Sequence, residues 1–258
     1  MKLVLVTGSA QRLGRTVIEA FAREGYACLV HANRSEAEAR ELCAGINAAG
    51  GRAAYFLHAI TDPAVAADAI LDAALAQFGM LPSCSVLSAA SYGLDDPARA
   101  LAQQVTDQLV LNYLFPAAYC AALAGRVQAL APAQAQEDRS VVLFTDYKVA
   151  KVNPDQFAYS LSKHALEGTL PYLAVAFARQ IRVNAIAPGP ILAAHGLTQA
   201  DLDALVQSRC ISGKSPRPQD IAATALFLAN TPSLYGQHIF VDAAARFEKG
   251  AHEYGVVQ

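Results

Sequence analysis

The sequence predicts a single α/β domain built on a doubly wound, mostly parallel sheet. Short apolar runs alternate with segments of helical spacing along all 258 residues, as in successive βαβ units with right-handed crossovers. Apolar residues make up 54% of the chain and charged residues only 16%, so there is enough apolar surface for a large core. No composition shift, internal repeat or low-complexity linker marks a second domain within 1–258.

The first βα unit has the clearest signals. Residues 3–6 form a continuous apolar run before Thr7-Gly8, which predicts a strand buried on both faces. Apolar residues at helical spacing predict a helix over 13–24, and Gly25 is placed to end it.

The second unit follows the same pattern. Residues 27–32 are another apolar run and predict the second strand. Ser35 and Glu38 have capping-box spacing, which predicts a helix that reaches about Ala49. Residues 53–58 predict the third strand.

The alternation continues toward the C-terminus. Pro63 at a first turn favours a helix over 63–78. The remaining strands are expected at 84–88, 140–145, 181–186 and 238–242. The remaining helices are expected at 97–130, 157–179, 199–208 and 218–229, with a loop at 132–139. Residues 190–217 are expected to cover a substrate, and the polar tail 248–258 to lie on the surface or against another subunit.

Composition and charge exclude several classes of function. The net charge is −2 and no basic block occurs, so a nucleic-acid partner is not expected. The five cysteines are scattered and form no C-x-x-C pair, so neither a disulfide framework nor a zinc site is expected. The histidines do not have the spacing of metal ligands, so no metal site is expected from them either. Reduced thiols fit a cytoplasmic protein. The first apolar run is too short for a signal peptide. The sequence contains no apolar run of about 18 residues, so a membrane-spanning helix is not expected.

The turn after the first strand predicts a phosphate-binding site. A glycine turn between strand and helix lets backbone N–H groups and the positive helix end face a pyrophosphate. Gly8 permits the sharp turn and Gly14 close packing of the helix on the strand, whereas Arg12 stands at the middle glycine position of the G-x-G-x-x-G pattern. The alternative is an ordinary βα turn without a ligand.

The end of the second strand favours NADP over NAD. An NAD site usually carries a carboxylate there for the ribose 2′-hydroxyl. This chain has Asn33-Arg34-Ser35 instead, and Arg34 with Ser35 can hold a 2′-phosphate. The alternative is that Arg34 is only solvated and Ser35 only caps a helix.

Tyr159 and Lys163 are the first candidate catalytic pair. A spacing of four puts the phenol and the ammonium on one face of a helix. A cation beside a phenol lowers the phenol pKa, so that Tyr159 can act as a general acid or base nearer neutrality. Asp146 ends the strand at 140–145, and Asn112 lies in the long preceding helix.

With these motifs, the chain resembles the short-chain dehydrogenase/reductase family over nearly its whole length. The resemblance rests on Thr7-Gly8 with Gly14, Asn112, Tyr159 with Lys163, the run from Ile181 to Gly189, and Gly236-Gln237 with Val241-Asp242. It implies a Rossmann-type domain with a seven-stranded sheet and helices on both faces, NAD(P), and commonly a homotetramer. It also implies that Tyr159 transfers the proton, that Lys163 lowers its pKa and holds the nicotinamide ribose, and that Asn112 supports a relay water.

Within that family, the chain is most similar to pteridine reductases and dihydromonapterin reductase-like proteins. Arg12 and the segment 31–35 match their pattern, Asp146 stands where most of the family has serine, and Tyr92 falls where an aromatic ring stacks a pterin. The resemblance therefore implies Arg12, Tyr92, Asp146 and Tyr159 as substrate-binding residues. The expected NADP(H) site comprises Gly8, Gln11, Arg12, Leu13, Gly14, Asn33, Arg34, Ser35, Ser88, Ala89, Tyr159, Lys163, Pro188, Gly189 and Ile191.

Three departures from the family pattern weaken the expected cofactor contacts. The usual Asn-Asn-Ala-Gly after the fourth strand is replaced by Leu87-Ser88-Ala89-Ala90. Ala59 stands where an aspartate commonly contacts the adenine, and a final Asp-Gly-Gly becomes Asp242-Ala243-Ala244. No catalytic group is lost.

Three functions follow as hypotheses. The leading one is an NADPH-dependent reductase of a pterin or dihydropterin, in which Asp146 and Tyr159 handle the proton. The second is a reductase of another carbonyl, such as a 3-oxoacyl thioester or a small ketone. The third is an NADP-binding protein with little catalysis. A small-molecule substrate and a homo-oligomer are expected in each case, and the low charge content agrees with a subunit interface.

Overall fold

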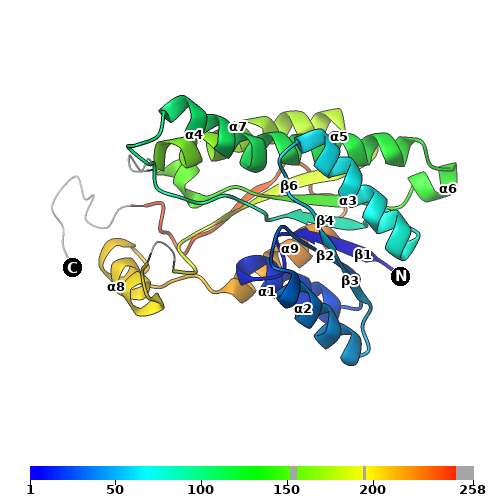
Figure 1. The fold of residues 1–258 in the computed structure, drawn as a ribbon, viewed down its shortest axis with the longest axis horizontal. Coiled ribbons are helices and arrows are strands. Elements are labelled where there is room, and N and C mark those ends of the chain that lie inside the picture. The colour runs from blue at the N-terminus through cyan, green and yellow to red at the C-terminus, as the bar shows by residue number, and fades with distance from the viewer. Residues whose placement is uncertain (152–155, 194–195, 248–258) are drawn as a thin grey trace.

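The computed structural model describes residues 1–151, 156–193 and 196–247, so the predicted tail 248–258 lies outside the described residues. Its centre is a seven-stranded sheet in the order β3-β2-β1-β4-β5-β6-β7 (Figure 1), and every neighbouring pair is parallel. The strands are β1 Leu3–Thr7, β2 Ala27–Ala32, β3 Ala53–Leu57, β4 Cys84–Leu87, β5 Ser140–Phe144, β6 Arg182–Pro188 and β7 His238–Val241. The predicted fold class and all seven predicted strands are confirmed.

Helices cover both faces of the sheet. The layer of α1, α2 and α9 packs on one face, and the layer of α3, α5 and α7 on the other (Figure 1). The main helices are α1 Arg12–Arg23, α2 Glu36–Ala48, α3 Pro63–Phe78, α4 Leu101–Leu109, α5 Phe115–Gln128, α7 Phe157–Ala176, α8 Gln199–Arg209 and α9 Pro218–Asn230. These two layers are the ones that a doubly wound topology requires.

The first strand shows how the sequence builds two cores. Leu3 and Leu5 pack into the core beneath α3, α5 and α7, whereas Val4 and Val6 pack into the core beneath α1, α2 and α9. Successive side chains of a strand point to opposite faces, so a strand covered on both sides needs an unbroken apolar run. This is why residues 3–6 lack the polar alternation of a half-exposed strand.

The long helical region differs from its prediction in one respect. One turn of π-helix, Val110–Leu114, separates α4 from α5. By length and composition the stretch Leu101–Gln128 is apolar enough to cross a membrane. The sequence prediction did not identify it, because polar residues interrupt the stretch and only its average hydropathy is high. In the fold, Phe115, Tyr119 and Leu123 are fully buried in the core under α3, as expected for a core helix.

Two short helices were not predicted. The loop expected at 132–139 contains the single helical turn α6, Pro132–Ala135. A 3₁₀ turn, Tyr147–Ala150, follows β5, and Asp146 caps its amino-terminal end. The second of these turns matters for function because it follows directly on a candidate catalytic residue.

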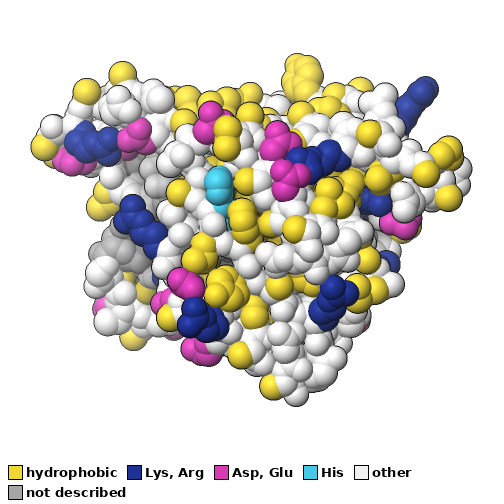
Figure 2. Space-filling model, turned by 45° about the vertical axis from the view of Figure 1, so that its right-hand side comes forward, with side chains coloured by type: hydrophobic (Ala, Val, Ile, Leu, Met, Phe, Trp, Pro, Cys, Tyr) yellow, Lys and Arg dark blue, Asp and Glu magenta, His cyan; other side chains and the backbone are white. Residues whose placement is uncertain are grey.

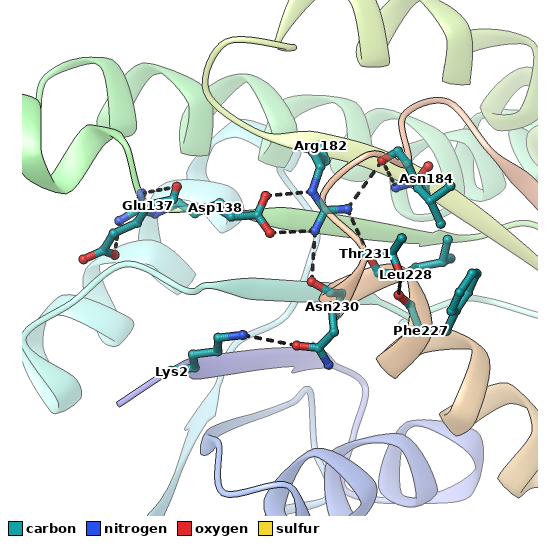
Figure 3. A network of polar contacts seen from close by, with 12 residues as sticks. Lys2, Glu137, Asp138, Arg182, Asn184, Phe227, Leu228, Asn230 and Thr231 are labelled. Atoms are coloured by element: carbon teal, nitrogen blue, oxygen red, sulfur yellow. Dashed lines mark hydrogen bonds and ion pairs between the residues drawn. The ribbon is translucent and has the colours of Figure 1, made fainter.

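Arg182 holds the amino-terminal end of β6 to the end of α9 (Figure 3). Its guanidinium is 1% exposed and donates to both carboxylate oxygens of Asp138, at 2.7 and 2.9 Å. It also donates to the carbonyls of Leu228 and Ala229, each at 2.9 Å, which lack partners within the helix. Asn184 bonds similarly to the backbone near β7. These two polar residues of the 181–189 run therefore have structural roles, at the end of the sheet opposite the candidate site.

Candidate active site

A cavity of about 950 Å³ opens at the carboxyl ends of the strands, where doubly wound folds bind ligands. All the predicted cofactor and substrate residues line it. Asn112, predicted as catalytic, is not among the lining residues. The lining residues that sequence reasoning did not select include His31, His58, Ile60, Leu111, Thr145, Tyr147, Lys148, Leu192, Leu197 and Leu202.

The turn between β1 and α1 requires both of its glycines. Gly8 has a φ of +66°, and a Cβ atom there would lie 3.0 Å from Cα of Ala89. A Cβ on Gly14 would lie 2.5 Å from the carbonyl oxygen of Gly8. Gly14 therefore lets α1 start directly against the turn, which aims the first backbone N–H groups of the helix into the cavity.

Arg12 adopts a conformation that normally belongs to glycine. Its φ is +54°, in the left-handed region that costs an L-residue about 1–2 kcal/mol. The guanidinium of Arg12 reaches across the mouth of the cavity and donates to the carbonyl of Ala193 at 3.1 Å. Strain of this kind persists where the surrounding structure enforces it, often at ligand sites. The conformation gives a physical reason for glycine in the usual pattern.

His31 joins the phosphate-binding turn to two strands. The backbone N–H of Gly8 donates to Nδ1 of His31 at 3.3 Å, so Nε2 carries the proton and donates to the carbonyl of His58 at 3.1 Å. Burial lowers the pKa of His31 to about 4, which keeps the ring neutral. The turn at Gly8 is thereby held by the side chain of His31, which lies 23 positions away in the sequence and reaches the turn only in the folded structure.

The residues expected to hold a 2′-phosphate stand at the mouth of the cavity. Asn33 and Arg34 are exposed, and Ser35 is half-buried at the start of α2. The predicted capping box is not formed: Ser35 makes no side-chain cap, and Glu38 accepts from Gln11 at 2.7 Å instead. The Ser35 hydroxyl is thus not engaged by the helix. The Glu38 carboxylate, which a capping box would direct at the backbone N–H of Ser35, bonds instead to Gln11, the residue just before α1.

The altered segment Leu87–Ala90, at the end of β4, is hydrogen-bonded to the end of β1. Ser88 donates from its hydroxyl to the carbonyl of Thr7 at 2.5 Å, and the N–H of Ala89 donates to Oγ1 of Thr7 at 3.0 Å. These bonds join the ends of two neighbouring central strands at the position where the usual pattern has two asparagines. Ala59 is exposed and does not line the cavity, whereas its neighbours His58 and Ile60 do.

Tyr159 and Asp146 meet at the other end of the cavity. Asp146 follows β5 and Tyr159 lies in the first turn of α7. The phenol donates to Oδ2 of Asp146 at 2.6 Å, and Oδ1 of Asp146 accepts the backbone N–H of Lys148 at 2.9 Å. Asp95 accepts the first N–H groups of α7, those of Phe157 and Ala158, and so anchors the turn that carries Tyr159.

The expected lowering of the Tyr159 pKa does not occur in this arrangement. The ammonium of Lys163 donates to the carbonyl of Phe144 at 2.7 Å and lies 5.8 Å from the centre of the Tyr159 ring. Burial and the Asp146 carboxylate raise the pKa of Tyr159 well above its ordinary value. Burial lowers the pKa of Lys163 to about 8, and burial raises the pKa of Asp146. The phenol is therefore a proton donor that stays protonated at neutral pH.

Asn112 lies behind the cavity in the π-helical turn, where it is 1% exposed. Its amide accepts the N–H of Ser91 and donates to the carbonyl of Ser91, both at 3.1 Å. It also donates to Gln108 at 2.7 Å and to Ser162 at 3.1 Å. These contacts hold the segment that carries Tyr92 against α7, the helix that carries Tyr159 and Lys163. The geometry gives Asn112 a positioning role, and its expected relay water stays a prediction.

Tyr92 and Lys148 form a second pair beside the first. The Tyr92 ring stands at 84° to the Tyr159 ring with centroids 4.9 Å apart. The ammonium of Lys148 donates to the Tyr92 hydroxyl at 3.0 Å and lies 5.0 Å from the centre of its ring. No motif pointed to Lys148, because its importance comes from a contact with a residue that is 56 positions away.

The segment predicted to cover the substrate lies against the cavity in part. Leu192, Leu197 and Leu202 line it, and α8 lies beyond the carboxyl ends of the strands (Figure 1). Residues 194–195 of this segment are outside the described residues. Within the described part of the chain, no group of three or more histidine, cysteine, aspartate or glutamate side chains is arranged to hold a metal ion.

The chain is similar to known proteins both in sequence and in structure. A family model described as enoyl-(acyl carrier protein) reductase, of the short-chain type, matches residues 8–244. The FolM alternative dihydrofolate reductase 1 of Brucella canis, solved with NADP, superposes with a TM-score of 0.84 at 28% identity, covering 97% of this chain and 96% of that chain. Pteridine reductase 1 of Leishmania tarentolae is 28% identical over 221 residues, 72% of this chain and 75% of the relative. The 3β-hydroxysteroid dehydrogenase 1 of Eggerthella lenta is 28% identical over 258 residues, 96% of this chain and 95% of the relative.

Proposed function

Because the chain belongs to the short-chain dehydrogenase/reductase family of oxidoreductases, we propose that it is an NADPH-dependent reductase of a pterin or dihydropterin. The observation that carries the proposal is the site of Asp146, Tyr159 and Tyr92 at one end of the cavity. It combines a proton-handling pair with an aromatic ring beside it. A flat heteroaromatic substrate that needs both a proton and a stacking surface fits this combination.

The residues around the other end of the cavity fit a phosphorylated dinucleotide. The two required glycines and the start of α1 offer N–H groups to a pyrophosphate. Arg34 and Ser35, with no carboxylate among residues 31–35, suit a 2′-phosphate better than a 2′-hydroxyl. The Brucella canis structure was solved with NADP, which supports the same choice here. Lys163 lines the cavity beside Tyr159 and would hold the nicotinamide ribose.

In the proposed reaction, bound NADPH supplies the hydride to a ring carbon of the substrate. Tyr159 donates its proton to the adjacent ring nitrogen, so the carbon–nitrogen double bond gains one hydride and one proton. Asp146 accepts the Tyr159 hydroxyl at 2.6 Å and restores the phenol by passing on a proton that it takes from water. The raised pKa of Asp146 lets this carboxyl hold a proton closer to neutrality than an exposed carboxyl does.

The substrate class follows from the groups beside that pair. A carboxyl at Asp146 can hold a proton and pass it on toward a ring nitrogen of a pterin, which a serine hydroxyl does only in part. The similarity to pteridine reductase 1 and to an alternative dihydrofolate reductase supports the same class. The similarity to a 3β-hydroxysteroid dehydrogenase supports a second candidate, a reductase of a ketone. An NADP-binding protein with little catalysis is the third candidate, favoured by the altered segment Leu87–Ala90.

The decisive experiment follows NADPH absorbance with the purified protein and a dihydropterin, beside a panel of ketones and a 3-oxoacyl thioester. We expect oxidation of NADPH with the dihydropterin and little with the panel. Turnover of only the ketones or the thioester would show that the protein is a reductase of another substrate class than pterins. Tight NADPH binding without turnover of any compound would favour a binding protein.

We also propose that the protein is a homo-oligomer, and the family leads us to expect a tetramer. Apolar side chains reach the surface over the layer of α4, α5 and α7, at the top of the view (Figure 2). Tyr172 and Val175 on α7 are 76% and 80% exposed, and apolar patches of this kind mark contact surfaces. Light scattering after size-exclusion chromatography measures the mass directly, and a monomer would overturn the proposal.

A further inference from the structure

Lys148 is a buried cation at the substrate end of the cavity, and its hydrogen-bond partners within the described part of the chain are neutral. The residue is 7% exposed, lines the cavity, and donates from its ammonium to the hydroxyl of Tyr92 and to Oε1 of Gln156. In the ranges 1–151, 156–193 and 196–247, no carboxylate forms an ion pair with it, in contrast to the buried Arg182 and its partner Asp138. Burying a charge without an ion-pair partner is costly, even with the Asp146 carboxylate attracting it through space, so such a group points to a ligand.

The ammonium sits next to the proton-handling pair. Asp146 uses one oxygen for the Tyr159 phenol and the other for the backbone N–H of Lys148. The Lys148 side chain then runs to Tyr92, whose ring meets the Tyr159 ring edge to face. Two donors, the Tyr159 phenol and the Lys148 ammonium, therefore flank the same aromatic surface of the cavity wall.

A pterin presents two neighbouring acceptors along one edge of its ring. The nitrogen that is protonated when a dihydropterin is reduced, N5, lies beside the carbonyl oxygen at ring position 4, and both point to the same edge of the ring. When one protein donor binds N5, the carbonyl oxygen at position 4 lies beside it and needs a second donor from the protein. Negative charge also spreads toward this edge as hydride reaches the ring, and a fixed cation stabilises it.

We infer that Lys148 is a specificity-determining residue that donates to the 4-oxo group of the substrate ring while Tyr159 serves the adjacent N5. The inference rests on the proposed function, since it names the substrate feature that this site selects. It predicts discrimination against rings in which a 4-amino group replaces the 4-oxo group, because the ammonium would then face another donor.

The test measures equilibrium binding of two non-reacting ligands, pterin and its 4-amino analogue 2,4-diaminopteridine, to the NADP⁺-loaded protein at neutral pH. A hydrogen bond from a charged donor corresponds to about 10- to 150-fold in affinity. We expect the natural protein to prefer pterin by a factor in that range. Lys148→Met should abolish the preference, and Lys148→Arg should restore part of it. Lys151→Met, a lysine change in the same segment that does not line the cavity, should leave the preference unchanged.

Turnover of dihydropterin separates this inference from the proposed function. Lys148→Met should raise KM for dihydropterin and leave the Kd of NADPH unchanged. Turnover together with a preference for pterin that survives in Lys148→Met would overturn the inference and keep the function. A Lys148-dependent preference without turnover would keep the inference and overturn the function. No preference in the natural protein, or no binding of either ligand, would overturn the inference.

Discussion

The phenol of Tyr159 donates a hydrogen bond of 2.6 Å to Oδ2 of Asp146, across 13 positions of sequence. This contact changes the expected electrostatics of the site. The carboxylate raises the pKa of Tyr159, whereas the Lys163 ammonium that was expected to lower it is bonded to a backbone carbonyl. The pair is arranged to hold a proton and to donate it, which is the direction that a reductase needs.

Replacing Tyr159 with Phe should remove the donor and keep the ring. Turnover should fall by about 10²- to 10⁴-fold, the usual contribution of a general acid, while NADPH binding stays unchanged. Asp146→Asn should lower turnover through loss of the group that reprotonates the phenol. NADPH consumption and NADPH fluorescence titration measure the two quantities, and full turnover in Tyr159→Phe would exclude the phenol as the acid.

Replacing Arg34 with Ala should weaken NADPH far more than NADH. An arginine–phosphate contact is a charge-assisted hydrogen bond, worth about 10- to 150-fold in affinity, and NADH lacks the 2′-phosphate. Arg40→Ala is a matched control, since Arg40 lies in α2, just after the segment that carries Arg34, and pairs with Glu36 instead. Fluorescence titration with both cofactors checks the prediction, and equal losses for NADPH and NADH would contradict it.

Arg12→Gly should weaken ligand binding without lowering stability. The substitution removes a strained φ of +54° that costs about 1–2 kcal/mol, and it loses only exposed hydrogen bonds to backbone carbonyls. Urea denaturation should give an unfolding free energy that is equal or up to about 1 kcal/mol higher. The Kd for NADPH should rise. Arg12→Lys keeps the strained backbone and a positive charge, and it should retain more affinity.

Ala243→Gly and Ala244→Gly should each stabilise the protein. Both alanines have positive φ values, +49° and +66°, in a conformation that glycine adopts without steric cost. Each change should raise the free energy of unfolding by about 1 kcal/mol. Ala245→Gly is the control, because Ala245 is buried at a φ outside that region, and it should destabilise. A loss of stability in both Ala243→Gly and Ala244→Gly would contradict the prediction that the backbone is strained at these two alanines.

Stability should fall as the pH drops from about 6.5 to about 4 through His31. Its pKa is lowered by burial from 6.5 to about 4, so the unfolded chain binds a proton in this window that the folded chain does not. The neutral ring's contribution is fully present above 6.5 and is lost as the pH falls toward 4, up to about 3 kcal/mol. His31→Gln should flatten the pH dependence of urea denaturation in this window. An unchanged slope would show that His31 does not titrate as its burial requires.

The sequence alone determined the order and type of the strands and main helices and the position of the two ends of the site. Hydrophobic periodicity is local, so the strand at 3–6 and the helix that places Tyr159 and Lys163 on one face follow from neighbouring residues. Parallel strands also bring their carboxyl ends to one edge, which is why Gly8, Arg34, Asp146 and Tyr159 line one cavity although they follow different strands.

The tertiary structure alone decided how the polar groups pair. Glu38 pairs with Gln11 instead of capping α2, His31 holds the N–H of Gly8, and Lys148 reaches Tyr92. These partners are separated by 27, 23 and 56 positions. Hydrogen bonds and pKa values depend on distances of a few ångströms and on burial, and both are set by how distant segments pack, which no local pattern records.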